Sequence, residues 1–148
     1  MTDRYKKFTV YITRISRCIR KIKNIEMIEY NLKSPHVSIL YNLYLFNSLT
    51  SKDLCDKCEE DKATISRTIN YLEVNDFITC IDKNKKRYNS LFFLTDKGKM
   101  VGEEITNKIN SILEQVNVCL SEEERVEFYN YLSKISDRLE EITDNLKK

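Results

Sequence analysis

Apolar residues recur every three or four positions along almost the whole chain, and this period constrains the fold more than any other feature. Positions i, i+3 and i+4 lie on one face of an α-helix, so the period is helical. Only two glycines and one proline occur among the 148 residues, which leaves few positions that favour tight turns. The sequence therefore predicts a mainly helical protein, long enough to form one domain, residues 1–148, with its own core.

Long amphipathic helices are predicted at both ends of the chain, in residues 1–33 and 101–148. The apolar stripe of the first helix is Phe8, Ile12, Ile15, Ile19 and Ile22. The last helix is predicted to start at a capping box, Ser121-Glu-Glu-Glu124, and its stripe is Phe128, Leu132, Ile135, Leu139, Ile142 and Leu146. Heptad-like seams of this kind are stable when they pack on another helix. We therefore expect residues 1–33 and 101–148 to be dimerisation helices of a homodimer.

Charge is divided unevenly between these two segments. Residues 1–33 carry nine Lys/Arg and three Asp/Glu, a net charge of +6, with Arg14, Arg17, Arg20, Lys21 and Lys23 off the apolar stripe. Residues 101–148 carry six Lys/Arg and eleven Asp/Glu, a net charge of −5. The two segments should attract each other, within one chain or between two chains.

Residues 34–100 predict a different arrangement. Ser34 followed by Pro35 is typical of a helix start, with serine as N-cap and a buried face that reads Ile39, Leu40, Leu43 and Phe46. Capping residues at Thr50, Asp61 and Thr95 predict three further helix starts. Between the last two, the period changes in 77–81 and 88–94, where β-branched and aromatic residues predict two strands.

The polar stretch Asp82–Arg87 joins these two strands and carries four cations. The predicted element order is helix, short helix, turn, helix and basic hairpin. This is the order of a winged helix-turn-helix, which we assign to residues 34–100. The expected fold class is mainly α with a small β-hairpin wing, that is, α+β.

The motifs of this segment resemble those of the multiple-antibiotic-resistance regulator (MarR) family of bacterial transcription factors. The similarity lies in LTSKDLCDKCEEDKATISRTINYLEVNDFI, residues 49–78, in the basic hairpin, and in LTDKG, residues 94–98. It extends to the long helices on both sides. One departure is that the acidic residue that usually stands two before the wing arginine is absent, since the chain reads Asn84-Lys85-Lys86-Arg87.

The resemblance implies how such a protein works. In the family the flanking helices of two subunits interlock, and the second helix of each motif enters a major groove. Many members lose DNA affinity when a small phenolic or other ligand binds between the two regions, or when a cysteine is oxidised. Those properties predict a dimeric repressor that binds a pseudo-palindromic double-stranded operator and is released by a small-molecule effector.

The candidate DNA-binding residues are polar or basic and lie on the helix-turn-helix and the wing. They combine donors for phosphate oxygens with side chains that pair with guanine and adenine edges. An ordinary solvated helix face is the alternative interpretation, and the basic hairpin favours DNA. The candidates are Ser51, Lys62, Thr64, Ser66, Arg67 and Asn70 on the helices, and Lys83, Lys85, Lys86 and Arg87 on the wing.

The five cysteines raise a second possibility, a redox- or metal-responsive DNA-binding sensor. Cys55 and Cys58 form a C-x-x-C, but no second pair completes a four-ligand zinc site, so we interpret both as small core residues. Cys18 lies among cations that lower the pKa of a thiol, which makes it a candidate redox residue. Packing at a dimer interface is the favoured alternative. We expect neither a metal nor a cofactor.

No nucleophile motif or phosphate-binding loop is present, and the single histidine, His36, lacks metal-binding partners. We therefore expect no enzyme. The polar N-terminus and the lack of a long apolar run predict a cytoplasmic protein without a membrane partner. A helical protein-interaction module that does not touch DNA remains a further alternative.

Overall fold

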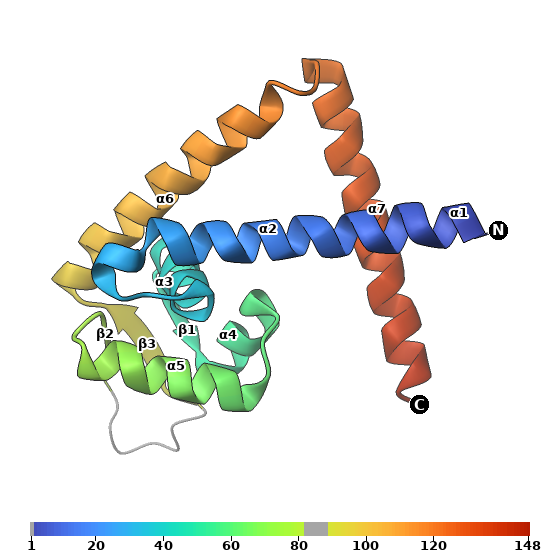
Figure 1. Ribbon diagram of the computed structural model, residues 1–148. Coiled ribbons are helices and arrows are strands. Elements are labelled where there is room, and N and C mark those ends of the chain that lie inside the picture. The colour runs from blue at the N-terminus through green and yellow to red at the C-terminus, as the bar shows by residue number, and fades with distance from the viewer. Residues whose placement is uncertain (1, 82–88) are drawn as a thin grey trace. The chain divides into compact units, whose positions relative to one another are not determined.

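The computed structural model describes residues 2–81 and 89–148, and it confirms a mainly helical fold with a small antiparallel sheet (Figure 1). The chain divides into two compact units, Met1–Lys108 and Ile109–Lys148. None of the described helices combines the length and the apolar composition needed to cross a membrane. In chain order the elements are α1 (Thr2–Tyr5), the π-helical turn η1 (Lys6–Val10), α2 (Tyr11–Glu26), the 3₁₀ turn η2 (Ile28–Tyr30), α3 (Ser34–Phe46), β1 (Ser48–Thr50), α4 (Ser51–Cys58), α5 (Lys62–Val74), β2 (Ile78–Cys80), β3 (Leu91–Leu94), α6 (Asp96–Asn117) and α7 (Glu122–Leu146).

The predicted N-terminal helix is formed by α1, η1 and α2, which follow one another without a break. Its apolar stripe is open in the single chain, where Ile12, Ile15 and Ile19 are 43%, 49% and 48% exposed. Lys23 departs from the expected basic surface, because its Nζ donates to Ser38 Oγ at 3.0 Å and its side chain is half-buried. Burial is the main cause that lowers the pKa of Lys23. The C-terminal end of α2 is thereby tied to α3.

Helix α3 begins one residue earlier than the sequence predicts. Lys33 is the N-cap, Ser34 is the first helical residue and Pro35 the second. The Ser34 N–H donates to Asn24 Oδ1 at 2.7 Å and the Lys33 N–H to His36 Nδ1 at 2.9 Å. The assignment of Ser34 as N-cap was therefore wrong. The side chain of Asn24, from α2, and that of the neighbouring His36 satisfy free N–H groups at this helix start.

The buried face of α3 is largely as predicted. Ile39, Leu40 and Leu43 are buried, together with Val37. Phe46 is the exception, since its side chain is 49% exposed and carries Lys57 Nζ 3.9 Å from its ring centroid. A cation over an aromatic face is itself attractive, so Phe46 is covered by a charge instead of by the core.

The two helix starts of the helix-turn-helix are as predicted. The carboxylate of Asp53 accepts the Thr50 N–H at 2.9 Å, and the Asp53 N–H donates to Thr50 Oγ1 at 3.1 Å, which is a reciprocal capping box. Asp61 accepts the Thr64 N–H at 2.8 Å and caps α5. Leu54 of α4 is fully buried, so the cap and the core fix this short helix together.

The predicted hairpin is present as β2 and β3, but the sheet has a third strand. Strand β1, which the sequence did not predict, pairs antiparallel with β3, so the order is β1-β3-β2. Phe92 lies opposite Leu49 and Cys80 in the central strand and is fully buried. The loop between β2 and β3, residues 82–88, lies outside the described residues.

The start of α6 depends on hydrogen bonds to the turn between α5 and β2. Thr95 caps α6, since its Oγ1 accepts the Gly98 N–H at 3.0 Å. The Thr95 N–H and hydroxyl also donate to the carbonyls of Phe77 and Asp76, at 3.1 and 2.7 Å. A Cβ at Gly98 would lie 1.9 Å from the Phe77 carbonyl oxygen, so only glycine fits this close approach. These contacts explain the L-T-x-x-G motif.

Lys108 joins α6 to the end of α2 and to η2. Its Nζ donates to the Glu26 carbonyl at 2.8 Å and lies 3.3 Å from Glu29 Oε1 and 3.2 Å from Glu104 Oε1. The Tyr30 hydroxyl donates to the other oxygen of Glu104 at 2.5 Å. With Glu26 Oε2 at 3.8 Å as well, the Lys108 ammonium is shared by three carboxylates.

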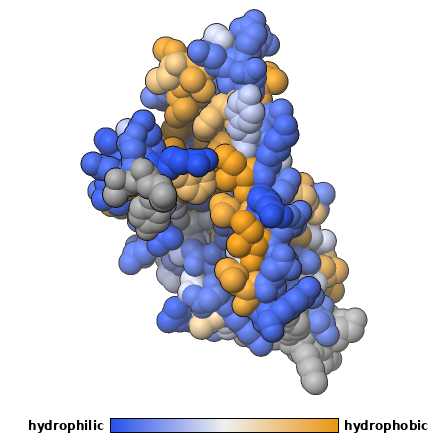
Figure 2. Space-filling model, turned by 90° about the vertical axis from the view of Figure 1, so that its right-hand side faces the viewer, coloured by the Kyte–Doolittle hydropathy of each residue, from blue (hydrophilic) through white to orange (hydrophobic). Residues whose placement is uncertain are grey.

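The second unit contains the end of α6 and all of α7. A full capping box starts α7 as predicted, with the Glu124 N–H donating to Ser121 Oγ and the Ser121 N–H to Glu124 Oε2. The predicted seam is open in the single chain, where Phe128, Ile135, Leu139 and Ile142 are 38–47% exposed. Figure 2 shows exposed apolar side chains bordered by hydrophilic ones on one face of the molecule.

The close approach at Gly98 gives a prediction. Gly98→Ala should lower the free energy of unfolding by about 1–3 kcal/mol, because the Phe77 backbone must shift to admit the methyl group. Gly102→Ala is the matched control on the same buried face, where the nearest atoms belong to the movable Tyr44 side chain at 3.1 Å. Urea denaturation should rank Gly98→Ala as the less stable variant. Equal stability would contradict the close approach.

Candidate nucleic-acid interface

The position of α5 is set by the turn that follows α4. Glu59 is the C-cap of α4 and has a left-handed backbone, φ 51°. Two residues later, Asp61 is the N-cap of α5. Asp61 holds Thr64 twice, through its N–H and through its hydroxyl, which donates at 2.9 Å. The hydrogen bond from the Thr64 N–H is the first of the causes that lower the pKa of Asp61. At neutral pH this cap is therefore charged and fixed.

The two faces of α5 are separated by burial. Ile65, Ile69 and Leu72 are buried as predicted, and the buried Thr68 hydroxyl donates to the Thr64 carbonyl at 2.6 Å. The opposite face is polar and open to solvent. Its exposed members among the predicted site residues are Lys62, Ser66, Arg67 and Asn70.

Two of the predicted residues are held by other side chains. Thr64 is half-buried, and both its N–H and its hydroxyl are used by Asp61, so it mainly supports the cap. Arg67 is exposed, and its Nη2 donates to Thr64 Oγ1 at 3.3 Å. This contact leaves the rest of the guanidinium open and orients it along α5. Arg67 can therefore present a planar pair of donors to a ligand.

The remaining predicted residues divide into two groups. Ser51 is the first residue of α4 and is half-buried at the end of β1. Lys83, Lys85, Lys86 and Arg87 lie outside the described residues. Among the described residues of the predicted site, Lys62, Ser66, Arg67 and Asn70 lie together on the exposed face of α5.

An acidic turn is a feature that the interpretation of the sequence missed. Glu59, Glu60 and Asp61 stand directly before α5, and a negative turn repels a phosphate at this end of the helix. The three consecutive acidic residues could have been recognised in the sequence. Favourable contacts to a polyanion should therefore come from positions further along α5, where Arg67 and Asn70 are exposed.

The two cysteines of the C-x-x-C in α4 have the properties of packing residues and not those of metal ligands. Cys55 and Cys58 are half-buried, so they are less buried than the core residues that the sequence predicted. Cys58 Sγ accepts a hydrogen bond from Asn42 Nδ2 at 3.6 Å. Burial raises the pKa of Cys55 and raises that of Cys58 to about 11. A protonated thiol is a poor nucleophile and a poor metal ligand. Cys18, by contrast, is exposed on α2.

His36 has a structural position at the contact of α3 with α5. Its Nδ1 accepts the Lys33 N–H, and its ring lies 4.3 Å from the Tyr71 ring, centroid to centroid. Burial, followed by the charge of Lys33, lowers the pKa of His36, so the ring is neutral at pH 7. Among residues 2–81 and 89–148, no three His, Cys, Asp or Glu side chains are arranged to hold a metal ion.

Comparison with known proteins links this arrangement to transcription regulators. No family model matches the chain. The helix-turn-helix transcriptional regulator YwoH of Bacillus subtilis (strain 168) is 27% identical over 117 residues, which cover 79% of this chain and 85% of that protein.

Solved structures give the same result. A MarR-family transcriptional regulator from Listeria monocytogenes, in complex with 26mer DNA, is 25% identical, covers 89% of this chain and 88% of its own, and has a TM-score of 0.82. Staphylococcus aureus MarR, in complex with salicylate and kanamycin, is 20% identical with 92% of each chain covered and a TM-score of 0.81. The chain therefore has the fold of MarR-family regulators, and the resemblance predicted from its motifs is confirmed.

The raised pKa of Cys58 can be tested by alkylation. With a pKa of about 11 against an ordinary value of 9.0, about one hundredth of the usual thiolate is present near neutral pH. Cys58 should react with iodoacetamide roughly a hundredfold more slowly in the folded chain than in urea, as measured by peptide mass spectrometry. The exposed Cys119 is the control and should change little. Equal rates for Cys58 in both states would contradict its burial.

Proposed function

We propose that this protein is a homodimeric, sequence-specific DNA-binding transcription regulator, a repressor that a small-molecule effector releases from a pseudo-palindromic operator. The observation that carries the proposal is the exposed polar face of α5, within a fold shared with a Listeria regulator in complex with DNA. Its helix-turn-helix neighbour YwoH supports the same class. In the proposal α5 enters a major groove, and half-sites lie about one helical turn apart.

Specific contacts in this proposal come from Arg67 and Asn70, with Ser66 and Lys62 beside them. A guanidinium can pair with guanine O6 and N7, and an amide can pair with adenine N6 and N7. Ser51 adds a contact at the start of α4, and Thr64, which is held by Asp61, contributes by positioning the Arg67 guanidinium. Lys83, Lys85, Lys86 and Arg87 are proposed to bind the backbone and the adjacent minor groove. Residues 34–100 form the DNA-binding region of the proposal.

The proposed dimer uses residues 1–33 and 101–148. Two apolar seams, on α2 and on α7, lack cover in the single chain, and their charges are opposite, +6 and −5. A second copy satisfies both conditions, because it supplies apolar surface for each seam and opposite charge beside it. Two-fold symmetry then matches the symmetry of a pseudo-palindrome.

Release by a small molecule is supported by the salicylate and kanamycin complex of the Staphylococcus regulator. A redox response at Cys18 is the alternative signal, because this thiol is exposed on α2 and can be reached by an oxidant. The similar proteins are transcription regulators. We propose that this one likewise has no enzymatic activity and works in the cytoplasm, where it can reach DNA.

The role of Arg67 can be tested by separating charge from shape. Arg67→Lys keeps the charge but loses the planar fork, so it should cost about 1–3 kcal/mol on the preferred operator and much less on random DNA. Gel shifts on both DNAs measure the two losses. Small and similar losses would assign Arg67 to phosphate binding.

Two further variants complete this test. Arg67→Ala should weaken operator binding more than Arg67→Lys. Arg138→Ala removes an exposed arginine of α7 that pairs with Glu141 and should leave the affinity unchanged. Wild-type affinity in a folded Arg67→Ala dimer would remove α5 from the interface and refute the proposed function.

The dimer can be tested at the α7 seam. Ile135→Asp places a carboxylate in the proposed apolar interface, which should cost a few kcal/mol in dimerisation and abolish operator binding with it. Sedimentation measures the first effect and a gel shift the second. Ser133→Asp adds the same charge at an exposed position off the seam and should retain the dimer. A monomeric variant that binds the full operator with wild-type affinity would contradict the proposal.

A further inference from the structure

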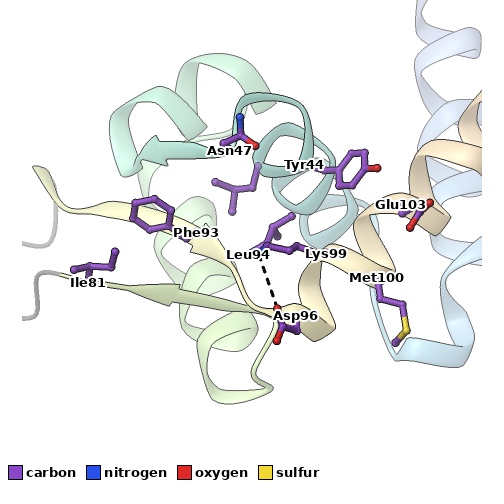
Figure 3. A pocket seen from close by; sticks show the side chains of 10 residues that line it. Tyr44, Asn47, Ile81, Phe93, Leu94, Asp96, Lys99, Met100 and Glu103 are labelled. Atoms are coloured by element: carbon purple, nitrogen blue, oxygen red, sulfur yellow. Dashed lines mark ion pairs between the residues drawn. The ribbon is translucent and has the colours of Figure 1, made fainter.

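A pocket of about 790 Å³ lies in the first unit, between the end of α3, strand β3 and the first turns of α6. This volume is within the range that binds drug-sized ligands. Figure 3 shows Tyr44, Met100 and Glu103 toward one end of it, Ile81 and Phe93 toward the other, and Leu94 between them. None of the predicted DNA-binding residues of α4 and α5, the ones that the structure describes, lines this pocket.

The apolar part of the pocket is open to solvent. Ile81 is 77% exposed and Met100 is 62% exposed, while Leu43 and Leu94 close the base. Exposed apolar surface around a concave site is typical of ligand binding. Tyr44 and Phe93 add aromatic surface, and the flexible thioether of Met100 can adapt to an apolar ligand.

The polar groups of the pocket have few partners within the chain. Among the described residues, the Glu103 carboxylate, the Tyr44 hydroxyl and the Asn47 amide take part in no hydrogen bond or ion pair, although each of these residues lines the pocket. These three groups together offer more acceptors than donors, since the carboxylate only accepts. A ligand that donates hydrogen bonds therefore complements them.

The charge of the pocket is negative. Asp96, Lys99 and Glu103 are its ionised residues, and Lys99 is already beside Asp96, with Nζ 3.9 Å from Oδ1. This pair leaves the carboxylate of Glu103 without a cation. An anion would meet two carboxylates and one lysine that is already beside Asp96, whereas a cation gains Glu103 and the face of the Tyr44 ring.

We propose that this pocket binds an amphipathic organic cation. Its ammonium lies against the Glu103 carboxylate and the Tyr44 ring, and its flat apolar body lies on Met100 and Phe93. Binding itself does not depend on the proposed function. Only the assignment of the cation as an effector rests on it, because β3 and the end of β2 lead to the loop assigned as the wing.

Three indoles of nearly equal shape test the class of ligand. Tryptamine is a cation, tryptophol is neutral and indole-3-propionate is an anion. The chain contains no tryptophan, so the fluorescence anisotropy of the probe, excited at its own band, reports binding directly. Tryptamine should bind at least about tenfold more tightly than the other two, because only it gains the carboxylate.

Glu103→Gln removes the negative charge at an exposed position and keeps the shape. It should reduce tryptamine affinity to that of tryptophol, while Glu114→Gln, an exposed glutamate of α6 outside the pocket, should change nothing. Three outcomes would overturn the proposal: equal affinities for the three probes, tighter binding of the anion, or no tryptamine binding up to about 10 mM. Wild-type tryptamine affinity in Glu103→Gln would do so as well.

DNA binding by the same variants is measured separately by gel shift. Glu103→Gln should bind operator DNA as the wild type does, since Glu103 is not among the proposed DNA contacts. If Glu103→Gln loses tryptamine binding but still binds DNA, the substitution has affected the pocket and not the DNA-binding surface. Loss of DNA binding in Arg67→Ala leaves the pocket and its probes unaffected.

Discussion

The burial of α3 is the interaction on which the rest of the first unit depends. This helix is apolar on nearly all sides, and α2, α4, α5, β1 and β3 all pack around it. Burial of a Leu or Ile side chain contributes about 1.5–3 kcal/mol each, and Val37, Ile39, Leu40 and Leu43 are all buried. Because these elements share one central helix, their positions are not independent.

Hydrogen bonds at helix starts then set the direction in which each element leaves this core. Asp53 and Asp61 fix the starts of α4 and α5, so the polar face of α5 turns outward when Ile65 and Ile69 turn inward. Thr95 and Gly98 fix α6 against the Phe77 carbonyl. The caps thus fix the start of the helix that carries the proposed DNA-binding face, α5, and the start of the helix that lines the pocket, α6.

The parts that the single chain leaves uncovered are as informative as its core. The exposed fraction is 38–49% for the seam residues Ile12, Ile15 and Ile19 of α2 and Phe128, Ile135, Leu139 and Ile142 of α7. Ile81 and Met100, which line the pocket, are 77% and 62% exposed. The two cases differ in their surroundings. The helices present long seams with opposite net charge, which suits a second copy, whereas the pocket is short, concave and negative, which suits a small cation.

The sequence by itself determined the elements whose causes are local. Capping at Thr50, Asp61, Thr95 and Ser121 and the helical period of the apolar residues predicted most helices, because a cap and a face require only neighbouring residues. The exposed face of α5 followed from the same period, since Ile65 and Ile69 lie on its opposite side.

Only the tertiary structure decided features that depend on distant residues. Strand β1 is three residues long and exists because β3 pairs with it. Asn24 of α2 accepts the Ser34 N–H at the start of α3, and Lys23 donates to Ser38 instead of lying on the expected basic surface. The pocket likewise is lined by residues between 43 and 103, and a local sequence period cannot predict that such distant residues come together. Local periodicity specifies which side of an element is apolar, whereas the partner of that side is specified only when the chain packs.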